Sequence, residues 1–109
     1  MTGALAWPPP PADHDERRRD KRYPCTRSAF IGLGQGGYPC LMENISAGGA
    51  RVTTSARISV GTTVTLHLDG WDAIPAQVVY STGLALGMRF IQDEDARRRL
   101  QGWIESHLV

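Results

Sequence analysis

Two short stretches of the chain carry residue types that could recognise a charged or polar ligand. In the first, five of the twelve basic residues fall within the six positions Arg17-Arg18-Arg19-Asp20-Lys21-Arg22. A guanidinium group presents several N–H donors in one plane, which suits phosphate oxygens and carboxylates. This stretch is therefore a local anion-binding segment, although the net charge of the whole chain is only +1.

The second stretch is Asn44-Ile45-Ser46-Ala47-Gly48-Gly49, whose residue types are those of a tight turn. Asn44 offers both a donor and an acceptor, Ser46 offers a hydroxyl, and Gly49 permits close approach because it has no Cβ. Ser46 lies outside the Gly-x-Ser-x-Gly pattern of a nucleophile elbow, and the sequence places no base beside it. The stretch therefore predicts recognition, and we assign no catalytic residue.

A third motif, GLGQGG over residues 32–37, matches the glycine spacing of dinucleotide-binding loops. Such a loop must open a helix whose N-terminus receives the pyrophosphate. Here the next residues, Tyr38-Pro39-Cys40, begin another strand-like run. The motif is therefore interpreted as a hairpin loop.

These stretches have to be positioned by a domain that follows a proline-rich leader. Residues 1–15 include four consecutive prolines and little apolar content, which predicts a disordered tail. After it, runs of β-branched, aromatic and aliphatic residues alternate with glycine-containing turns, which predicts strands joined by short antiparallel connections. The expected strands are Tyr23–Ile31, Tyr38–Asn44, Gly49–Thr54, Thr63–Leu68, Ala73–Tyr80 and Leu84–Ile91.

The pattern changes to helical spacing at the end of the chain. Apolar residues recur at Ala96, Leu100, Trp103, Ile104 and Leu108, after three acidic residues that suit a helix N-terminus. We therefore expect an all-β fold, a six-stranded antiparallel β-barrel over residues 23–91, with one C-terminal α-helix over residues 93–108. Closure of the barrel removes exposed strand edges, and the helix can cover one open end.

The composition predicts one cytoplasmic domain. Hydrophobic residues make up 41% and charged residues 21% of 109 residues, while no apolar run reaches the roughly 18 residues that span a bilayer. Two cysteines and three scattered histidines lack the spacing of a metal site, so neither a metal nor a cofactor is expected. Cys25 should lie opposite the neighbourhood of Asn44 and away from Cys40, so no disulfide is expected.

With these motifs in this order, the chain resembles the bacterial PilZ domain family. That family has RxxxR before its first strand, here Arg18 to Arg22, and [D/N]xSxxG between its second and third strands, here Asn44 to Gly49. The ISAGGARV run, the approach to the fourth strand over residues 60–64 and the segment Gly87-Met88-Arg89-Phe90 also resemble the family. The likeness extends from Arg17 to Val109 and leaves only the proline-rich leader outside, so residues 16–109 are the expected PilZ domain.

The resemblance implies that the chain binds the second messenger cyclic di-GMP. Arginine can contact both the phosphates and the guanine edges of this ligand, and an asparagine with a serine can read a guanine edge. The residues implied as ligand contacts are Arg18, Arg22, Asn44, Ser46 and Gly49. Arg17 and Arg19 are assigned as helpers, and the segment over residues 16–22 is expected to be an arm that only the ligand holds against the barrel.

The sequence is compatible with three alternative functions. The first is a stand-alone cyclic di-GMP receptor that relays the signal to an unidentified protein partner. The second is a ligand-independent PilZ-like adaptor, which the intact motif pair disfavours. The third is a small barrel that binds single-stranded nucleic acid, which the near-neutral charge and only eight aromatic residues disfavour. Arg51 and Arg89 could face the ligand, but the sequence alone leaves their side of the sheet open.

Overall fold

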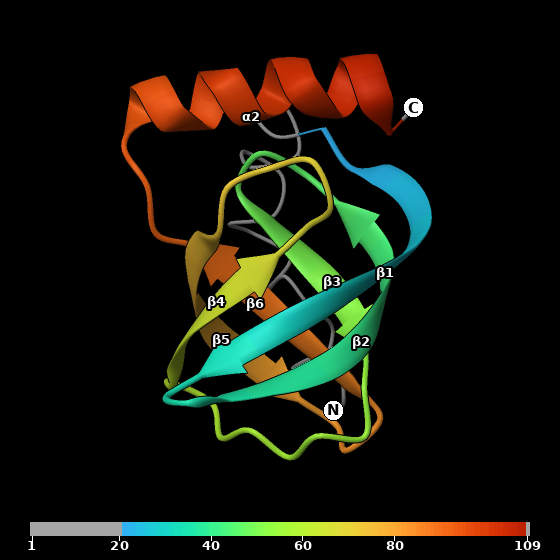
Figure 1. Ribbon diagram of the computed structural model, residues 1–109, viewed down its shortest axis with the longest axis vertical. Coiled ribbons are helices and arrows are strands. Elements are labelled where there is room, and N and C mark those ends of the chain that lie inside the picture. Colours follow the sequence, from blue (N-terminus) through green and yellow to red (C-terminus); the bar gives the residue numbers. More distant parts are fainter. Residues whose placement is uncertain (1–20, 109) are drawn as a thin grey trace, which may run out of the picture.

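Six strands form one closed antiparallel barrel in the computed structural model, which describes residues 21–108 (Figure 1). Around the barrel the strand order is β1-β2-β3-β6-β5-β4, and pairing of β4 with β1 closes it. The strands are β1 Tyr23–Leu33, β2 Gly36–Ile45, β3 Gly49–Thr53, β4 Thr63–His67, β5 Ile74–Ser81 and β6 Ala85–Phe90. The predicted fold class is confirmed, with strand ends shifted by only a few residues.

The core fills the barrel because apolar residues alternate along each strand. In β4, Val64 and Leu66 are buried, whereas Thr65 is half-buried and His67 is exposed, as the sequence pattern predicts. The largest fully buried side chains are Ile31, Met42, Ile45, Leu66, Leu86, Met88, Leu100, Ile104, Val52 and Val78. These residues come from all six strands and from the helix, so one continuous core joins all the elements that carry the site.

The hairpin between β1 and β2 is tighter than the GLGQGG motif predicts. Gly32 pairs with Gly37 and Leu33 pairs with Gly36, which leaves only Gly34 and Gln35 in the turn. Gly34 has a φ of 60°, a left-handed conformation that glycine adopts without strain. The motif is therefore a hairpin, as expected, but most of its glycines belong to the strands.

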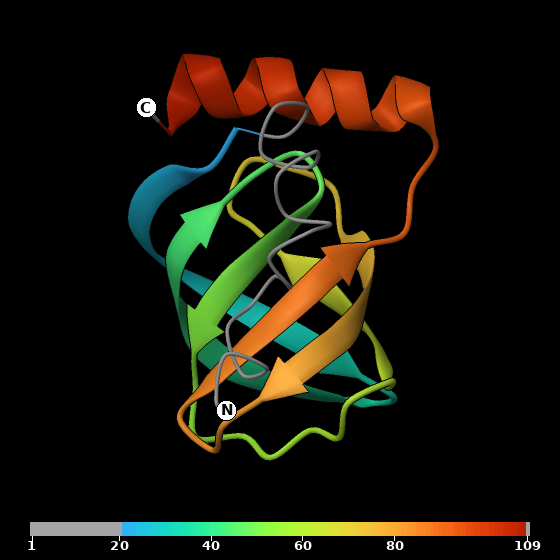
Figure 2. The same cartoon turned by 180° about the vertical axis from the view of Figure 1, so that it is seen from behind.

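The helix α2, Glu94–His107, lies across one end of the barrel (Figure 2). It begins after Asp93, whose side chain accepts a hydrogen bond of 2.8 Å from the backbone N–H of Ala96. Leu100 and Ile104 are fully buried and close the core at this end. The hydroxyl of Tyr23 at the start of β1 donates to Glu105 at 2.9 Å, which ties the helix to the beginning of the barrel. Within residues 21–108 no helix has the length and apolarity needed to cross a membrane.

Both cysteines are buried free thiols, and we expect them to be unreactive in the folded protein. Ala29 is the residue that pairs with Cys40, while Pro24, next to Cys25, pairs with Asn44, so the predicted register is confirmed. Burial raises the pKa of the Cys40 thiol to about 11, and the thiolate is the reactive form. At pH 8 a thiol reagent should therefore label the native protein slowly and label two thiols rapidly in urea. Rapid labelling of the native protein, or a disulfide-shifted mass, would contradict this expectation.

Candidate functional site

The two predicted motifs meet at the start of β1 and the end of β2. Pro24 pairs with Asn44 across these strands, which brings Arg22 beside the same asparagine. A guanidinium nitrogen of Arg22, Nη1, donates to Asn44 Oδ1 at 3.0 Å. Two side chains that are 22 positions apart in the sequence therefore form one polar surface. The predicted contact Arg18 and the predicted helpers Arg17 and Arg19 lie outside the described residues.

The Arg22 contact corrects one expectation about the arm. The sequence predicts that only the ligand holds residues 16–22 against the barrel. Arg22 is instead attached by a hydrogen bond within the protein, because an amide oxygen is available at the neighbouring strand end. The end of the arm next to β1 is thus already positioned on the candidate ligand surface.

Ser46 organises the turn between β2 and β3 from inside. Its hydroxyl oxygen accepts hydrogen bonds from the backbone N–H groups of Gly48 and Gly49, at 3.1 and 3.2 Å. The backbone N–H of Ser46 also donates to the carbonyl of Gly49 at 2.8 Å, and the residue is 3% exposed. Through these bonds Ser46 sets the shape of the turn and thereby the position of Asn44.

Gly49 is needed for packing between strands. It pairs with Arg89 of β6, and an added Cβ would fall well inside van der Waals contact with the carbonyl oxygen of Met88. The sequence suggests that a glycine here lets a ligand approach closely. The structure adds a different reason, because the nearest atoms to the missing side chain belong to the neighbouring β6 backbone.

Three further residues extend the surface beyond the predicted set. Arg51 of β3 pairs with Asn44 of β2, so both side chains lie on the outer face of the barrel. Its Nε donates to Glu43 Oε1 at 2.8 Å, and its guanidinium carbon lies 5.6 Å from the centroid of the Tyr80 ring. Side chains alternate between the two faces of a strand, and Ala50 and Val52 are buried. Once the start of β3 is known, this alternation places the Arg51 side chain on the outer face of the barrel.

Arg89 also faces outward but lies beside a different partner. Its Nη2 donates to Gln77 Oε1 at 3.2 Å across β5 and β6. Because Arg89 pairs with Gly49 across β3 and β6, it borders the turn on the side away from Arg22. The outer face of β2, β3, β6 and β5, together with the residue just before β1, forms one surface that we call the polar face. It presents Arg22, Asn44, Arg51, Tyr80 and Arg89.

The charges on the polar face influence one another. A hydrogen bond from Thr53, together with Arg51, holds the pKa of the Glu43 carboxyl below its usual value despite partial burial. Burial raises the pKa of Tyr80, while the positive charges of Arg51 and Arg22 oppose that rise. Both guanidinium groups thus act on the same phenol ring. Such an arrangement suits a ligand that combines negative charge with a flat ring system.

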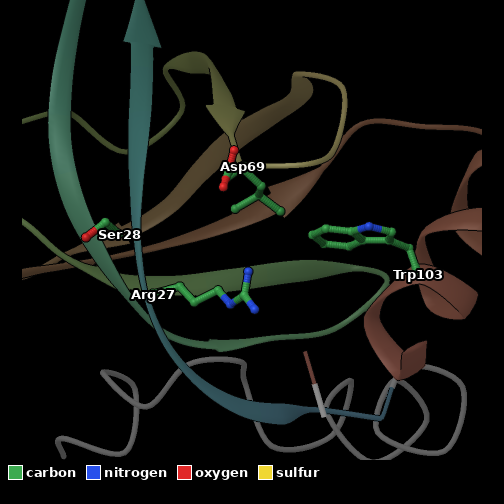
Figure 3. Close-up of a pocket in the computed structure, with 5 residues that line it drawn as sticks. Arg27, Ser28, Asp69 and Trp103 are labelled. Carbon is green, nitrogen blue, oxygen red and sulfur yellow. The ribbon is translucent and has the colours of Figure 1, made fainter. Parts of the chain in front are cut away.

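A separate pocket of about 290 Å³ lies between β1, the loop after β4 and α2 (Figure 3). It is lined by Arg27, Ser28, Leu68, Asp69 and Trp103, and Figure 3 shows the Arg27 and Trp103 side chains directed toward its centre. Arg27 Nη2 donates to the carbonyl oxygen of His107 at 3.3 Å, so this side chain is fixed to the end of the helix. Of the sequence-predicted site residues that the structure describes, none lines this pocket.

In the part of the chain from Lys21 to Leu108, no group of three histidine, cysteine or acidic side chains is arranged to hold a metal ion. The side chains of the polar face can form hydrogen bonds, ion pairs and stacking contacts.

Comparison with known proteins gives a match to the PilZ domain model over residues 16–106. The search of curated proteins found no match. Among solved structures, the PilZ domain of CeSA from a cellulose-synthesizing bacterium is similar, with a TM-score of 0.63 and 26% sequence identity. This likeness covers 77% of the present chain and 97% of the CeSA domain.

Two similar structures were solved in complex with c-di-GMP. PlzA of Borreliella burgdorferi is 28% identical with a TM-score of 0.52, over 74% of the present chain and 31% of PlzA. YcgR of Escherichia coli has a TM-score of 0.61 over 83% of the present chain and 45% of YcgR. Its 21% identity supports likeness of fold alone. The present chain spans less than half the length of either protein.

Proposed function

The chain belongs to the PilZ domain family, and we propose that it is a receptor for cyclic di-GMP that binds this ligand on the polar face. The observation that carries the proposal is the 3.0 Å hydrogen bond between Arg22 and Asn44, which joins the two family motifs into one surface. Cyclic di-GMP presents two phosphates and two guanines. The guanidinium group of arginine can form paired hydrogen bonds with phosphate oxygens and with the O6 and N7 atoms of guanine. A surface with two arginines around an asparagine therefore suits this ligand.

Within this proposal the motif residues have different roles. Arg18 and Arg22 contact phosphate or guanine acceptors, and Asn44 reads a guanine edge through its amide. Ser46 and Gly49 act on the ligand mainly by fixing the turn that carries Asn44, since the Ser46 hydroxyl is bonded to the turn backbone. Arg17 and Arg19 raise the local positive potential. Residues 16–22 form the ligand arm of a domain that spans residues 16–109.

We further propose that ligand binding is relayed to a protein partner rather than coupled to catalysis. PilZ domains are non-catalytic receptors. The helix α2 is connected to the start of β1 through Tyr23 and Glu105, so a change around Arg22 can reach the surface of the helix. That contact supports a binding module whose exposed surface reports the state of its ligand site.

Calorimetric titration of the full chain with cyclic di-GMP, GTP and a single-stranded oligonucleotide tests the proposal. We expect saturable binding of cyclic di-GMP and affinity for GTP at least about tenfold weaker, because GTP presents only one guanine to the polar face. Binding of the oligonucleotide in preference to cyclic di-GMP would favour a nucleic-acid barrel. Absence of binding to all three probes would favour the ligand-independent adaptor.

A further inference from the structure

An acidic side chain lies inside the polar face, at a break in the regular pairing of β2. Met42 pairs with Val52 and Asn44 with Arg51, so Glu43 is an extra residue between two consecutive pairs. Such a bulge turns two successive residues toward the same side of a sheet. Glu43 and Asn44 are accordingly both half-buried, between the fully buried Met42 and Ile45.

The carboxylate of Glu43 is held by two neighbours on β3. Arg51 Nε donates to Oε1 at 2.8 Å, and the hydroxyl of Thr53 donates to Oε2. The side chains of Glu43 and Arg51 are each 38% exposed, so their ion pair is open to an incoming solute. A pair at this level of exposure is weak enough for another anion to replace one partner.

The same arginine belongs to the group that the ligand would contact. Arg51 is the cross-strand partner of Asn44, and Asn44 accepts a hydrogen bond from Arg22. The guanidinium group of Arg51 also lies over the ring of Tyr80. An anion that reaches Arg22 and Asn44 therefore also meets Arg51 together with the negative charge of Glu43. The anion must either displace Glu43 from Arg51 or remain close to a like charge, and both alternatives oppose binding.

We propose that Glu43 is a built-in counter-ion that competes with the phosphates of the ligand for Arg51 and thereby limits the affinity of the polar face. This inference rests on the proposed binding of cyclic di-GMP there. It assigns Arg51 as a further ligand contact and Glu43 as the residue that sets how tightly the contact is made. A ligand with one negative charge would only take the place of the Glu43 carboxylate at Arg51. The polar face should therefore favour ligands that carry more than one negative charge.

The test is calorimetric titration of the wild-type chain and Glu43→Gln with cyclic di-GMP under identical salt conditions. Glutamine keeps the size of the side chain and an acceptor for Arg51 but removes the negative charge. We expect Glu43→Gln to bind about fivefold more tightly than the wild type. Asp72→Asn, which removes the same charge from the exposed loop between β4 and β5, should leave the affinity unchanged within about twofold.

The route of the effect is tested in an Arg51→Ala background. Arg51→Ala alone should weaken binding, and adding Glu43→Gln to it should recover much less than the fivefold gain, because competition for Arg51 is gone. Thermal unfolding of each variant monitors the fold, and Glu43→Ala provides a second neutral variant if Glu43→Gln is unstable.

The outcomes separate this inference from the proposed function. Binding by the wild type with no gain in either neutral variant would overturn the counter-ion role and leave the receptor role standing. An equal gain with and without Arg51, or an equal gain in Asp72→Asn, would overturn competition for Arg51. If neither the wild type nor the neutral variants bind cyclic di-GMP, both the inference and the proposed function are wrong.

Discussion

Arg22→Ala should reduce the affinity for cyclic di-GMP by roughly 10- to 100-fold while leaving the barrel folded. A charge-assisted hydrogen bond contributes about 1.5 to 3 kcal/mol, and Arg22 can make at least one such bond to the ligand. Its present bond to Asn44 also positions the amide that we propose to read guanine, so the substitution would disturb two contacts. The side chain precedes β1 and is outside the core, so the free energy of unfolding should change by less than about 1 kcal/mol.

Calorimetric titration of Arg22→Ala, Arg22→Lys and Arg57→Ala measures this effect. Arg57→Ala is the matched control, since it removes the same charge from the exposed loop between β3 and β4, at the end of the barrel away from α2 (Figure 1). Arg22→Lys keeps the charge but loses the planar fork, so its affinity should lie between those of the wild type and Arg22→Ala. Affinity of Arg22→Ala within twofold of the wild type would overturn the assigned contact.

Gly49→Ala should destabilise the folded protein by about 3 kcal/mol, with a fall in Tm of more than about 10 °C. The new methyl group would collide with the carbonyl of Met88 and lie 3.4 Å from the Cα of Arg89. Both neighbours are backbone atoms in paired strands, so relief requires β3 and β6 to separate. Loss of ligand binding in this variant would follow from damage to the fold.

Gly37→Ala is the control, because it adds the same methyl group on β2 where no atom lies within 4 Å. That substitution should change stability by less than about 0.5 kcal/mol. Urea unfolding of both variants gives the comparison. Equal stability of Gly49→Ala and the wild type would show that the glycine serves close approach of a ligand rather than strand packing.

The barrel was predictable because its strands bury one side and expose the other. Val64 and Leu66 alternate with Thr65 and His67, and this period of two is typical of a strand that is buried on one face. Glycine is less informative about where a strand ends. Gly32 and Gly37 look like loop residues in the sequence, yet they pair with each other, and the turn contains only two residues. Turn length depends on strand register, which local composition does not determine.

The polar face was predictable only in part. Arg22 and Asn44 stand out through their motifs, and their contact is seen in the structure. Tyr80 could not be found by alternation, because it shares parity with the buried residues Ala76 and Val78. A register shift between Val78 and Tyr80 turns its ring outward against Arg51. Such a bulge depends on contacts between strands and leaves no clear signal in one sequence.

The bulge in β2 also bears on how this strand can change length during evolution. Deletion of the codon for Glu43 would join Met42 directly to Asn44, whose partners Val52 and Arg51 are already consecutive in β3. Against β3, the inward and outward alternation of β2 would then continue without interruption. A deletion of a neighbouring core residue would instead reverse the orientation of the strand beyond it. Position 43 is therefore a place where β2 can gain or lose one residue, and with it one charge, without reversing its orientation against β3.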